Sequence, residues 1–470
     1  MAIAVVLARR LGPDLFGSFI FVQWLIDMAF LVCSAGLGGV ATRFFPQSVG
    51  SGGDCIPGFN RWYLRAGAVV VLLTSCFATL AVITFSNLGN IAPITAIAFW
   101  ASTNSIWALL GARVQGLFQF KRFTASSAIF VVVALSVLAL PQVGGNLFVA
   151  ILAVAAANLA AGAYCAMDIC NREGISRNEP LAKIHSEPIF YYAMNTWLTS
   201  IVASFVWARG EISVVKGHLG ETMVGYYSVG LTLSGMINQG IGLLTGALWP
   251  QIARAWDNGN RNELAQFVMV VTNLLLLVAG VAAGFVICFA PYIITLLFGE
   301  GYLQSSKLVL IFTLGVLGLT CGCAHLVIQA ATNGKFARDL TIGGAVALFG
   351  AAFILIPYFG IEGAAAARSA TQIGVGVVTF ARLGKVLGHS AGTRQNLRSF
   401  VLLVTLVGGL VLLRSSGLEL RIWSLCALFT AYCSFMYLIC LPGRDTGMLR
   451  ELQKLSAIPS QKSASNMLDE

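Results

Sequence analysis

The segment FVMVVTNLLLLVAGVAAGFVICF, residues Phe267–Phe289, contains no charged side chain. Apolar runs of roughly twenty residues recur along the whole chain, and each is long enough to cross a hydrocarbon core of about 30 Å as an α-helix. Hydrophobic residues make up 57% of the sequence and charged residues only 10%, which leaves too few polar side chains to solvate a soluble protein of this size. The sequence therefore predicts an all-α polytopic membrane protein.

The apolar runs predict about fourteen transmembrane helices, in two six-helix lobes followed by two further helices. We place an N-terminal lobe and its cytoplasmic connector at residues 1–187, a C-terminal lobe at 188–388, the two extra helices at 389–441 and a cytoplasmic tail at 442–470. The first run, Met1–Ala8, is too short to span a bilayer or to be a signal peptide. We therefore expect a truncated first helix, whose start lies on the order of 15–30 residues upstream.

Loop charges predict the orientation. The connections after the second, fourth and sixth predicted helices carry Lys and Arg, whereas those after the third and fifth, Ser86–Asn90 and Pro141–Asn146, carry no charge. By the positive-inside rule the even-numbered helix ends and the C-terminus face the cytoplasm. Topology, with an anionic substrate as a further contribution, explains the net charge of +10 better than nucleic-acid binding does. Two halves with the same orientation fit a parallel repeat, in which substrate sites form between the halves.

One run departs from this apolar pattern. Trp207–Lys216, WARGEISVVK, places Arg209, Glu211 and Lys216 inside a predicted span. Because a charge inside a membrane is costly, such residues normally face a bundle interior or a watery cavity. The alternative is that Arg209 and Glu211 lie at a membrane surface and mark a helix end. Asp27, inside the second predicted span, and Glu211 could carry a coupling proton or sodium ion, or could pair with an arginine.

The eleven cysteines do not form a disulfide framework, because most of them fall in apolar runs without the spacing of a secreted domain. The segment Cys321-Gly-Cys323-Ala-His325 has metal-binding residue types, but it lies in an apolar run and no second pair accompanies it. The sequence therefore predicts no metal site and no cofactor.

Six segments carry a family resemblance. They are LARRLGPDLFG at 7–17, GLGGVATRF at 36–44, VGYYS at 224–228, ALWPQI at 247–252, LLFGEGY at 296–302 and YFGIEGAA at 358–365. In this order they resemble segments of the polysaccharide and lipid-linked oligosaccharide flippases, which include O-antigen flippases, of the multidrug/oligosaccharidyl-lipid/polysaccharide exporter superfamily. The resemblance covers nearly the whole chain, although most of the family's first helix has no counterpart here.

The resemblance implies two six-helix lobes around a central cavity that opens alternately to each side. Its implied substrate is an undecaprenyl-diphosphate-linked oligosaccharide, moved to the outer leaflet of a bacterial plasma (inner) membrane for polysaccharide biosynthesis, lipopolysaccharide included. The implied partners are this substrate, membrane lipids and other polysaccharide-assembly membrane proteins, and not nucleic acid. A transporter of this kind is not an enzyme.

The resemblance also directs attention to arginines, because a planar guanidinium suits diphosphate oxygens better than the point charge of lysine does. Four arginines and two amides are candidate contacts for the diphosphate and sugar headgroup: Arg9, which occupies the family's A-R position, Arg43, Arg209, Arg368, Asn238 and Gln239. Arg9 could instead anchor the chain at the interface, and Arg43 could be an ordinary positive-inside residue. The two amides could simply join helices.

Two other functions remain in view. A cation-coupled multidrug extruder of the same superfamily would need several buried acids in its first lobe, where this chain offers mainly Asp27. A membrane glycan polymerase, or a scaffold that transports nothing, is disfavoured because no connection exceeds about twenty residues and none on the outer side offers a catalytic domain.

Overall fold

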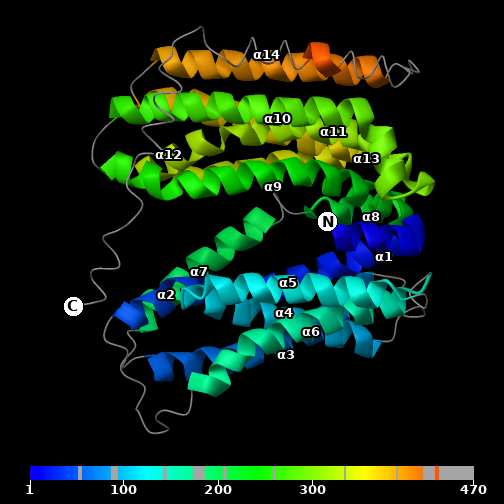
Figure 1. Cartoon of the computed structure of the whole chain (residues 1–470), viewed down its shortest axis with the longest axis vertical. Helices are drawn as coiled ribbons and strands as arrows, with labels where there is room; N and C mark the ends of the chain where they lie inside the picture. The colour runs from blue at the N-terminus through cyan, green and yellow to red at the C-terminus, as the bar shows by residue number, and fades with distance from the viewer. Residues whose placement is uncertain are drawn as a thin grey trace. The chain divides into compact units, whose positions relative to one another are not determined.

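The computed structural model shows a helical chain (Figure 1). It describes residues 1–50, 56–85, 94–140, 145–172, 186–204, 209–257, 261–332, 335–387, 390–415 and 429–432. Within these ranges the chain forms α-helices and two short 3₁₀ helices, and no strand. Eight of the described helices are long and apolar enough to cross a membrane, which confirms the prediction of an all-α polytopic membrane protein.

The helices follow one another with short connections. In chain order they are α1 (Ala2–Cys33), α2 (Leu37–Gly50), α3 (Ile56–Phe85), α4 (Ile94–Gly116), α5 (Phe120–Leu138), α6 (Leu147–Arg172), α7 (Ser186–Ala203), α8 (Ile212–Leu219), α9 (Glu221–Asp257), α10 (Arg261–Leu297), the 3₁₀ helix η4 (Glu300–Tyr302), α11 (Ser305–Gly318), the 3₁₀ helix η5 (Leu319–Cys321), α12 (Gly322–Thr332), α13 (Lys335–Leu387) and α14 (Ser390–Ser415).

Two helices run through a glycine at which the backbone leaves the helical conformation. α1 is broken at Gly12, whose φ of 73° and ψ of 174° lie outside the helical region, and Pro13 follows. α13 joins two predicted spans and is broken at Gly360, with φ 58° and ψ −139°. Only glycine adopts such positive φ values without a steric penalty. The predicted last span lies outside the described residues except for 429–432, and so does the whole predicted tail.

The predicted seventh span is divided. α7 ends at Ala203 and α8 begins at Ile212, and the backbone is π-helical at Ser204 and again at Arg209. A turn at Gly210 and Glu211 separates Arg209 from the start of α8. This break places Arg209 and Glu211 outside a continuous helix.

The chain divides into two compact units, and each is described here by itself. The first comprises Met1–Gly235, Ala290–Phe312 and Arg338–Thr371; the second comprises Met236–Phe289, Thr313–Ala337 and Gln372–Glu470. The division into lobes at residues 187 and 188 stays a prediction. Within the first unit α4, α5 and α6 pack side by side (Figure 1), and Phe19 of α1 stacks on Trp100 of α4 with ring centroids 5.0 Å apart.

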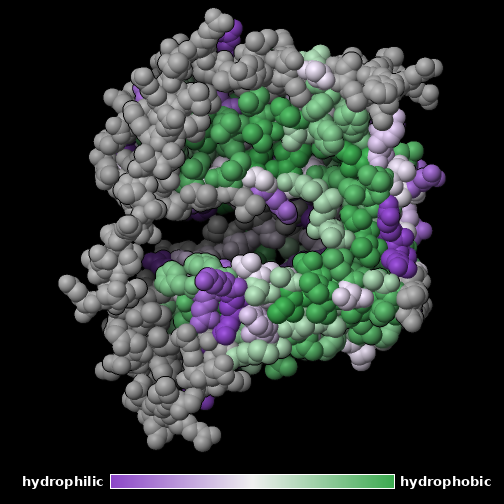
Figure 2. Space-filling model, in the orientation of Figure 1, coloured by the Kyte–Doolittle hydropathy of each residue, from purple (hydrophilic) through white to green (hydrophobic). Residues whose placement is uncertain are grey.

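The described surface is apolar, as a lipid-facing surface must be. Figure 2 shows hydrophobic side chains over most of the described surface in its view. On α3 the large exposed apolar side chains recur every three or four residues, as in Val69, Leu72, Leu73, Phe77 and Leu80. This spacing defines one helix face, and we interpret it as the face that α3 presents to lipid.

Helices α1 and α9 meet in the first unit through two glycines. A Cβ atom on Gly17 would overlap the backbone of Glu221, and one on Gly225 would overlap the backbone of Pro13. Close approach of this kind, through small residues, is typical of helix packing in membranes. A hydrogen bond from Ser18 to the carboxylate of Glu221 adds to the contact. The start of α9 is thereby fixed on α1, close to the break that carries Arg209.

In the second unit, helices also pack closely at glycines. A Cβ atom on Gly318 would overlap the carbonyl group of Gln372, and one on Gly284 would overlap the ring of Tyr432. The Tyr432 hydroxyl donates a hydrogen bond to the carbonyl oxygen of Gly280 at 2.8 Å. These contacts hold residues 429–432 against α10.

Candidate functional site

Four charged side chains come together in the first unit, although they are far apart in the sequence. Asp27 lies on α1, Arg209 in the break between α7 and α8, Glu211 at the N-cap of α8 and Arg368 on α13. The Arg209 guanidinium is close enough to interact electrostatically with Asp27, Glu211 and Arg368. We call these four residues the charged network. With all four ionised, its two carboxylates and two guanidinium groups balance.

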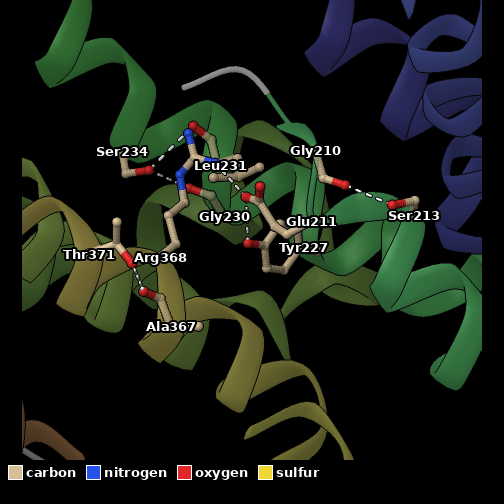
Figure 3. Close-up of polar contacts among 10 residues, drawn as sticks. All are labelled: Gly210, Glu211, Ser213, Tyr227, Gly230, Leu231, Ser234, Ala367, Arg368 and Thr371. Carbon is tan, nitrogen blue, oxygen red and sulfur yellow. Dashed lines mark hydrogen bonds and ion pairs between the residues drawn. The ribbon is translucent and has the colours of Figure 1, made fainter. Parts of the chain in front are cut away.

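One end of the charged network is a buried ion pair. The Arg368 guanidinium donates a hydrogen bond to Oε1 of Glu211, and the Tyr227 hydroxyl donates to the same oxygen at 2.8 Å. Figure 3 shows Arg368 reaching from α13 toward Glu211, with Ser234 of α9 beside its guanidinium. Glu211 is 0% exposed and Arg368 7%. Because burying a lone charge is far more costly than burying a paired one, each residue depends on the other.

Glu211 sits at the N-cap of α8, where its carboxylate also benefits from the positive end of the helix dipole. Among the described residues, its second oxygen, Oε2, is buried and has no hydrogen-bond partner. Glu211 is therefore buried inside the protein, and its depth in the membrane stays a prediction. The helix end that was the alternative does occur, but it lies inside the protein.

At the other end of the charged network, Asp27 and Arg209 line a cavity. A cavity of about 480 Å³ in the first unit is lined by Asp27, Arg209, Gln23 and Ser204, together with apolar side chains of α1 such as Trp24. Asp27 is exposed to this cavity. The sequence predicted that the segment with Arg209 faces a cavity, and Arg209 is among the residues that line this one.

A side chain of α4 helps to position Asp27. Asn104 of that helix donates a hydrogen bond from Nδ2 to Oδ1 of Asp27 at 3.2 Å. Asp27 is thus an anion beside a cation, in a cavity that water can enter. Ser204 and Arg209, the two ends of the helix break, both line the same cavity. The cavity can accept an anionic group through Arg209, and hydroxyl groups through Gln23 and Ser204.

Comparison with known proteins identifies the family. Residues 1–256, more than half of the chain, match the sequence model of the family described as polysaccharide biosynthesis protein. The chain belongs to this family. The match includes Asp27, Arg209 and Glu211 but ends before Arg368. No curated protein matches the sequence.

The fold of this polysaccharide biosynthesis protein is shared with solved transporters of low sequence identity. An inward-facing multidrug resistance MATE family transporter of the MOP superfamily aligns with a TM-score of 0.65 and 15% identity, over 83% of this chain and 95% of that one. The lipid II flippase MurJ in an inward closed conformation aligns with 0.62 and 13%, over 93% and 94%. MATE in complex with MaD3S aligns with 0.56 and 14%, over 82% and 91%. These likenesses establish the fold.

The other two predicted arginines, Arg9 and Arg43, lie elsewhere in the first unit. Arg9 is exposed and donates hydrogen bonds to the carbonyl oxygens of Leu297, at 2.7 Å, and Leu296, the last residues of α10. Arg9 therefore supplies hydrogen-bond donors to carbonyl groups at the C-terminal end of α10. Arg43 is exposed, and its guanidinium lies 4.2 Å from the ring centroid of Tyr192, a cation–π contact. A headgroup role for either arginine stays a prediction.

The two predicted amides are not part of the charged network. Asn238 and Gln239 lie on α9 within the second unit. The Asn238 side-chain oxygen is buried without a hydrogen-bond partner among the described residues, and Gln239 is exposed. Their contact with sugar hydroxyls stays a prediction. Cys321 and Cys323 are buried around the junction of η5 and α12.

Sequence reasoning missed two members of the site in this polysaccharide biosynthesis protein. Tyr227 is 0% exposed and donates a hydrogen bond to Oε1 of Glu211. Asn104 was not singled out, although it is a polar side chain inside an apolar run. Lys216, which the sequence places inside a predicted span, pairs through its ammonium group with Glu221 at 3.0 Å and donates a hydrogen bond to the carbonyl oxygen of Phe85 at 2.8 Å.

Proposed function

We propose that the chain is an alternating-access transporter that flips an undecaprenyl-diphosphate-linked oligosaccharide from the cytoplasmic to the outer leaflet of a bacterial plasma membrane. The observation that carries the proposal is Arg209 lining a cavity within the membrane helices of a polysaccharide biosynthesis protein. A charge at such a depth is costly and is usually functional. The fold shared with the lipid II flippase MurJ supports the same proposal.

The chemistry of the cavity suits a lipid-linked diphosphate. The diphosphate is an anion that would be stranded in hydrocarbon without a cationic partner, and the Arg209 guanidinium can donate two parallel hydrogen bonds to its oxygens. Gln23 and Ser204 supply hydrogen-bonding groups for sugar hydroxyls. Apolar side chains of α1 line the rest of the cavity, which leaves the polyprenyl chain to lipid or to these side chains.

The loop charges support the proposed orientation. Positive loop charges favour a cytoplasmic C-terminus and cytoplasmic ends of the even-numbered spans. Two six-helix lobes that rock against each other would expose the cavity to each side in turn. Transport without a chemical step on the substrate is consistent with this arrangement, and we propose no enzymatic activity.

Complementation tests the proposed function. We expect the chain, expressed in a strain that lacks its polysaccharide flippase, to restore surface polymer. Arg209→Gln should lower the polymer about tenfold or more, because the diphosphate loses its partner. Arg338→Gln is the matched control, since Arg338 is an exposed arginine paired with the adjacent Asp339, and it should leave the polymer unchanged. Full activity of a stably inserted Arg209→Gln protein would contradict the proposal.

A cation-coupled multidrug extruder is the second candidate, and one observation favours it. Asp27 presents a carboxylate to the cavity, where it could hold a cationic drug. An efflux assay with cationic dyes separates the two functions. Dye export that Asp27→Asn abolishes, together with no restoration of surface polymer by the wild type, would favour the extruder.

A further inference from the structure

Arg209 interacts electrostatically with two carboxylates, those of Asp27 and Glu211, and the two are held differently. Glu211 is 0% exposed, and Oε1 accepts hydrogen bonds from Arg368 and Tyr227. Asp27 is exposed to the cavity and accepts a hydrogen bond from the amide of Asn104. Glu211 is therefore fixed in place, whereas Asp27 faces the space that a substrate would enter.

We propose that Asp27 is a replaceable counter-ion: it balances Arg209 while the cavity is empty, and it takes up a proton when an anionic phosphate group binds Arg209. The inference rests on the proposed function, because the anion would be the diphosphate of the lipid-linked substrate. It gives Asp27 a role of its own, which is to link substrate binding to the uptake of one proton.

The groups around Asp27 explain why this carboxylate is the one that becomes protonated. Beside it lie Asn104 from α4, Gln23 from its own helix, and Arg209 from the helix break, while α5 and α6 contribute the apolar Phe130 and Val154 to the cavity. Two anions in one confined site cannot both stay ionised beside a single cation.

The carboxylate of Glu211 stays ionised, because its protonation would remove the negative charge that is paired with the buried Arg368. Asp27 meets no such penalty, because the ion that it balances, Arg209, passes to the phosphate. Asp27, unlike Glu211, lines the cavity.

The step is balanced. The phosphate oxygens accept hydrogen bonds from the guanidinium N–H groups of Arg209, and the Asp27 carboxylate gains one proton from the bulk solution to become a neutral carboxylic acid. The neutral acid can still accept the Asn104 hydrogen bond through its carbonyl oxygen. No covalent bond in the substrate forms or breaks. When the phosphate leaves, Asp27 loses its proton and balances Arg209 again.

Proton uptake on binding tests the inference. The purified full chain in weakly buffered detergent is titrated with geranyl diphosphate, a short polyprenyl diphosphate, and a pH-indicator dye reports protons while calorimetry reports binding. We expect the wild type to take up about one proton per ligand, with affinity rising about tenfold for each unit of pH lowered. Asp27→Asn should bind about tenfold more tightly than the wild type at neutral pH, because the opposing charge is gone. It should take up about one proton fewer, and Asp339→Asn, an exposed control, should match the wild type.

Three results separate the possibilities. Equal proton uptake by wild type and Asp27→Asn would overturn the inference while leaving the proposed function intact. No binding of geranyl diphosphate by the wild type would overturn both. If Asp27→Asn does not yield monodisperse protein, Arg209→Gln and Asp27→Glu carry the test: the first should lose binding and proton uptake together, and the second should keep both. Proton uptake lost in Asp27→Glu would count against the inference.

Discussion

The buried pair of Glu211 and Arg368 allows a quantitative prediction about stability. Their side chains are 0% and 8% exposed, so removing one partner leaves an uncompensated charge in the protein interior. Such a change costs about 3–5 kcal/mol, whereas replacing both partners by apolar residues is often close to neutral. We expect Glu211→Leu and Arg368→Met each to destabilise the protein by about 3 kcal/mol or more. The double variant should lose much less than the sum, which gives a coupling free energy of at least about 2 kcal/mol.

The assay is a double-mutant cycle on the free energy of unfolding in mixed micelles, supported by apparent melting temperatures from intrinsic fluorescence. A control cycle uses Lys307 and Glu362, whose charged atoms lie 3.8 Å apart and whose side chains are 72% and 51% exposed. An exposed pair of this kind should couple by less than about 1 kcal/mol. Additive effects of Glu211→Leu and Arg368→Met would refute the reasoning, because they would mean that neither charge depends on the other.

Three further predictions concern residues around the site. Gly225→Leu should lower the melting temperature strongly because a side chain there would overlap the backbone of α1, whereas Gly240→Ala should be tolerated because no described atom lies within 4 Å of the new Cβ; overpacking of this kind costs about 1–3 kcal/mol or more. Gly12→Ala should cost about 1–3 kcal/mol through backbone strain alone, because φ is 73° and the surroundings are open; a circular dichroism melt checks it. Tyr227→Phe should destabilise the protein by about 1.5–3 kcal/mol, the value of a hydrogen bond to a charged group, and an unchanged chemical-unfolding midpoint would contradict this.

The sequence predicted the membrane class because every spanning helix must be apolar along its length. It did not predict how spans join or break, since those events depend on single residues. Gly360 turns the chain between two predicted spans, yet α13 includes both of them, and the turn at Gly210 and Glu211 lies inside a single predicted span, just before α8. Hydropathy is averaged over many residues, so it predicts which segments can span a membrane but not where the backbone turns.

The sequence predicted which residues of the charged network are unusual in a membrane, but not how they pair. Arg209 and Glu211 are neighbours in sequence, and their cost in a membrane marks them from composition alone. Arg368 is separated from Glu211 by 157 positions, and Asn104 from Asp27 by 77. Pairing over such separations is a property of the folded helices. A sequence without aligned relatives shows which charges need partners, but not which partners they find.

The break between α7 and α8 explains why one short segment serves two purposes. Arg209 lines the cavity, and Glu211, two positions further along the non-helical backbone, is fully buried. The buried ion pair then ties the start of α8 to α13, and Arg209 precedes that anchor by two positions. A guanidinium held so close to a fixed anchor, on a backbone that is not a regular helix, can exchange the carboxylate of Asp27 for a phosphate without disturbing the core. The stability of the buried pair and the exchange at Arg209 should therefore be separable by mutation: Asp27→Asn should alter binding and leave the unfolding free energy nearly unchanged.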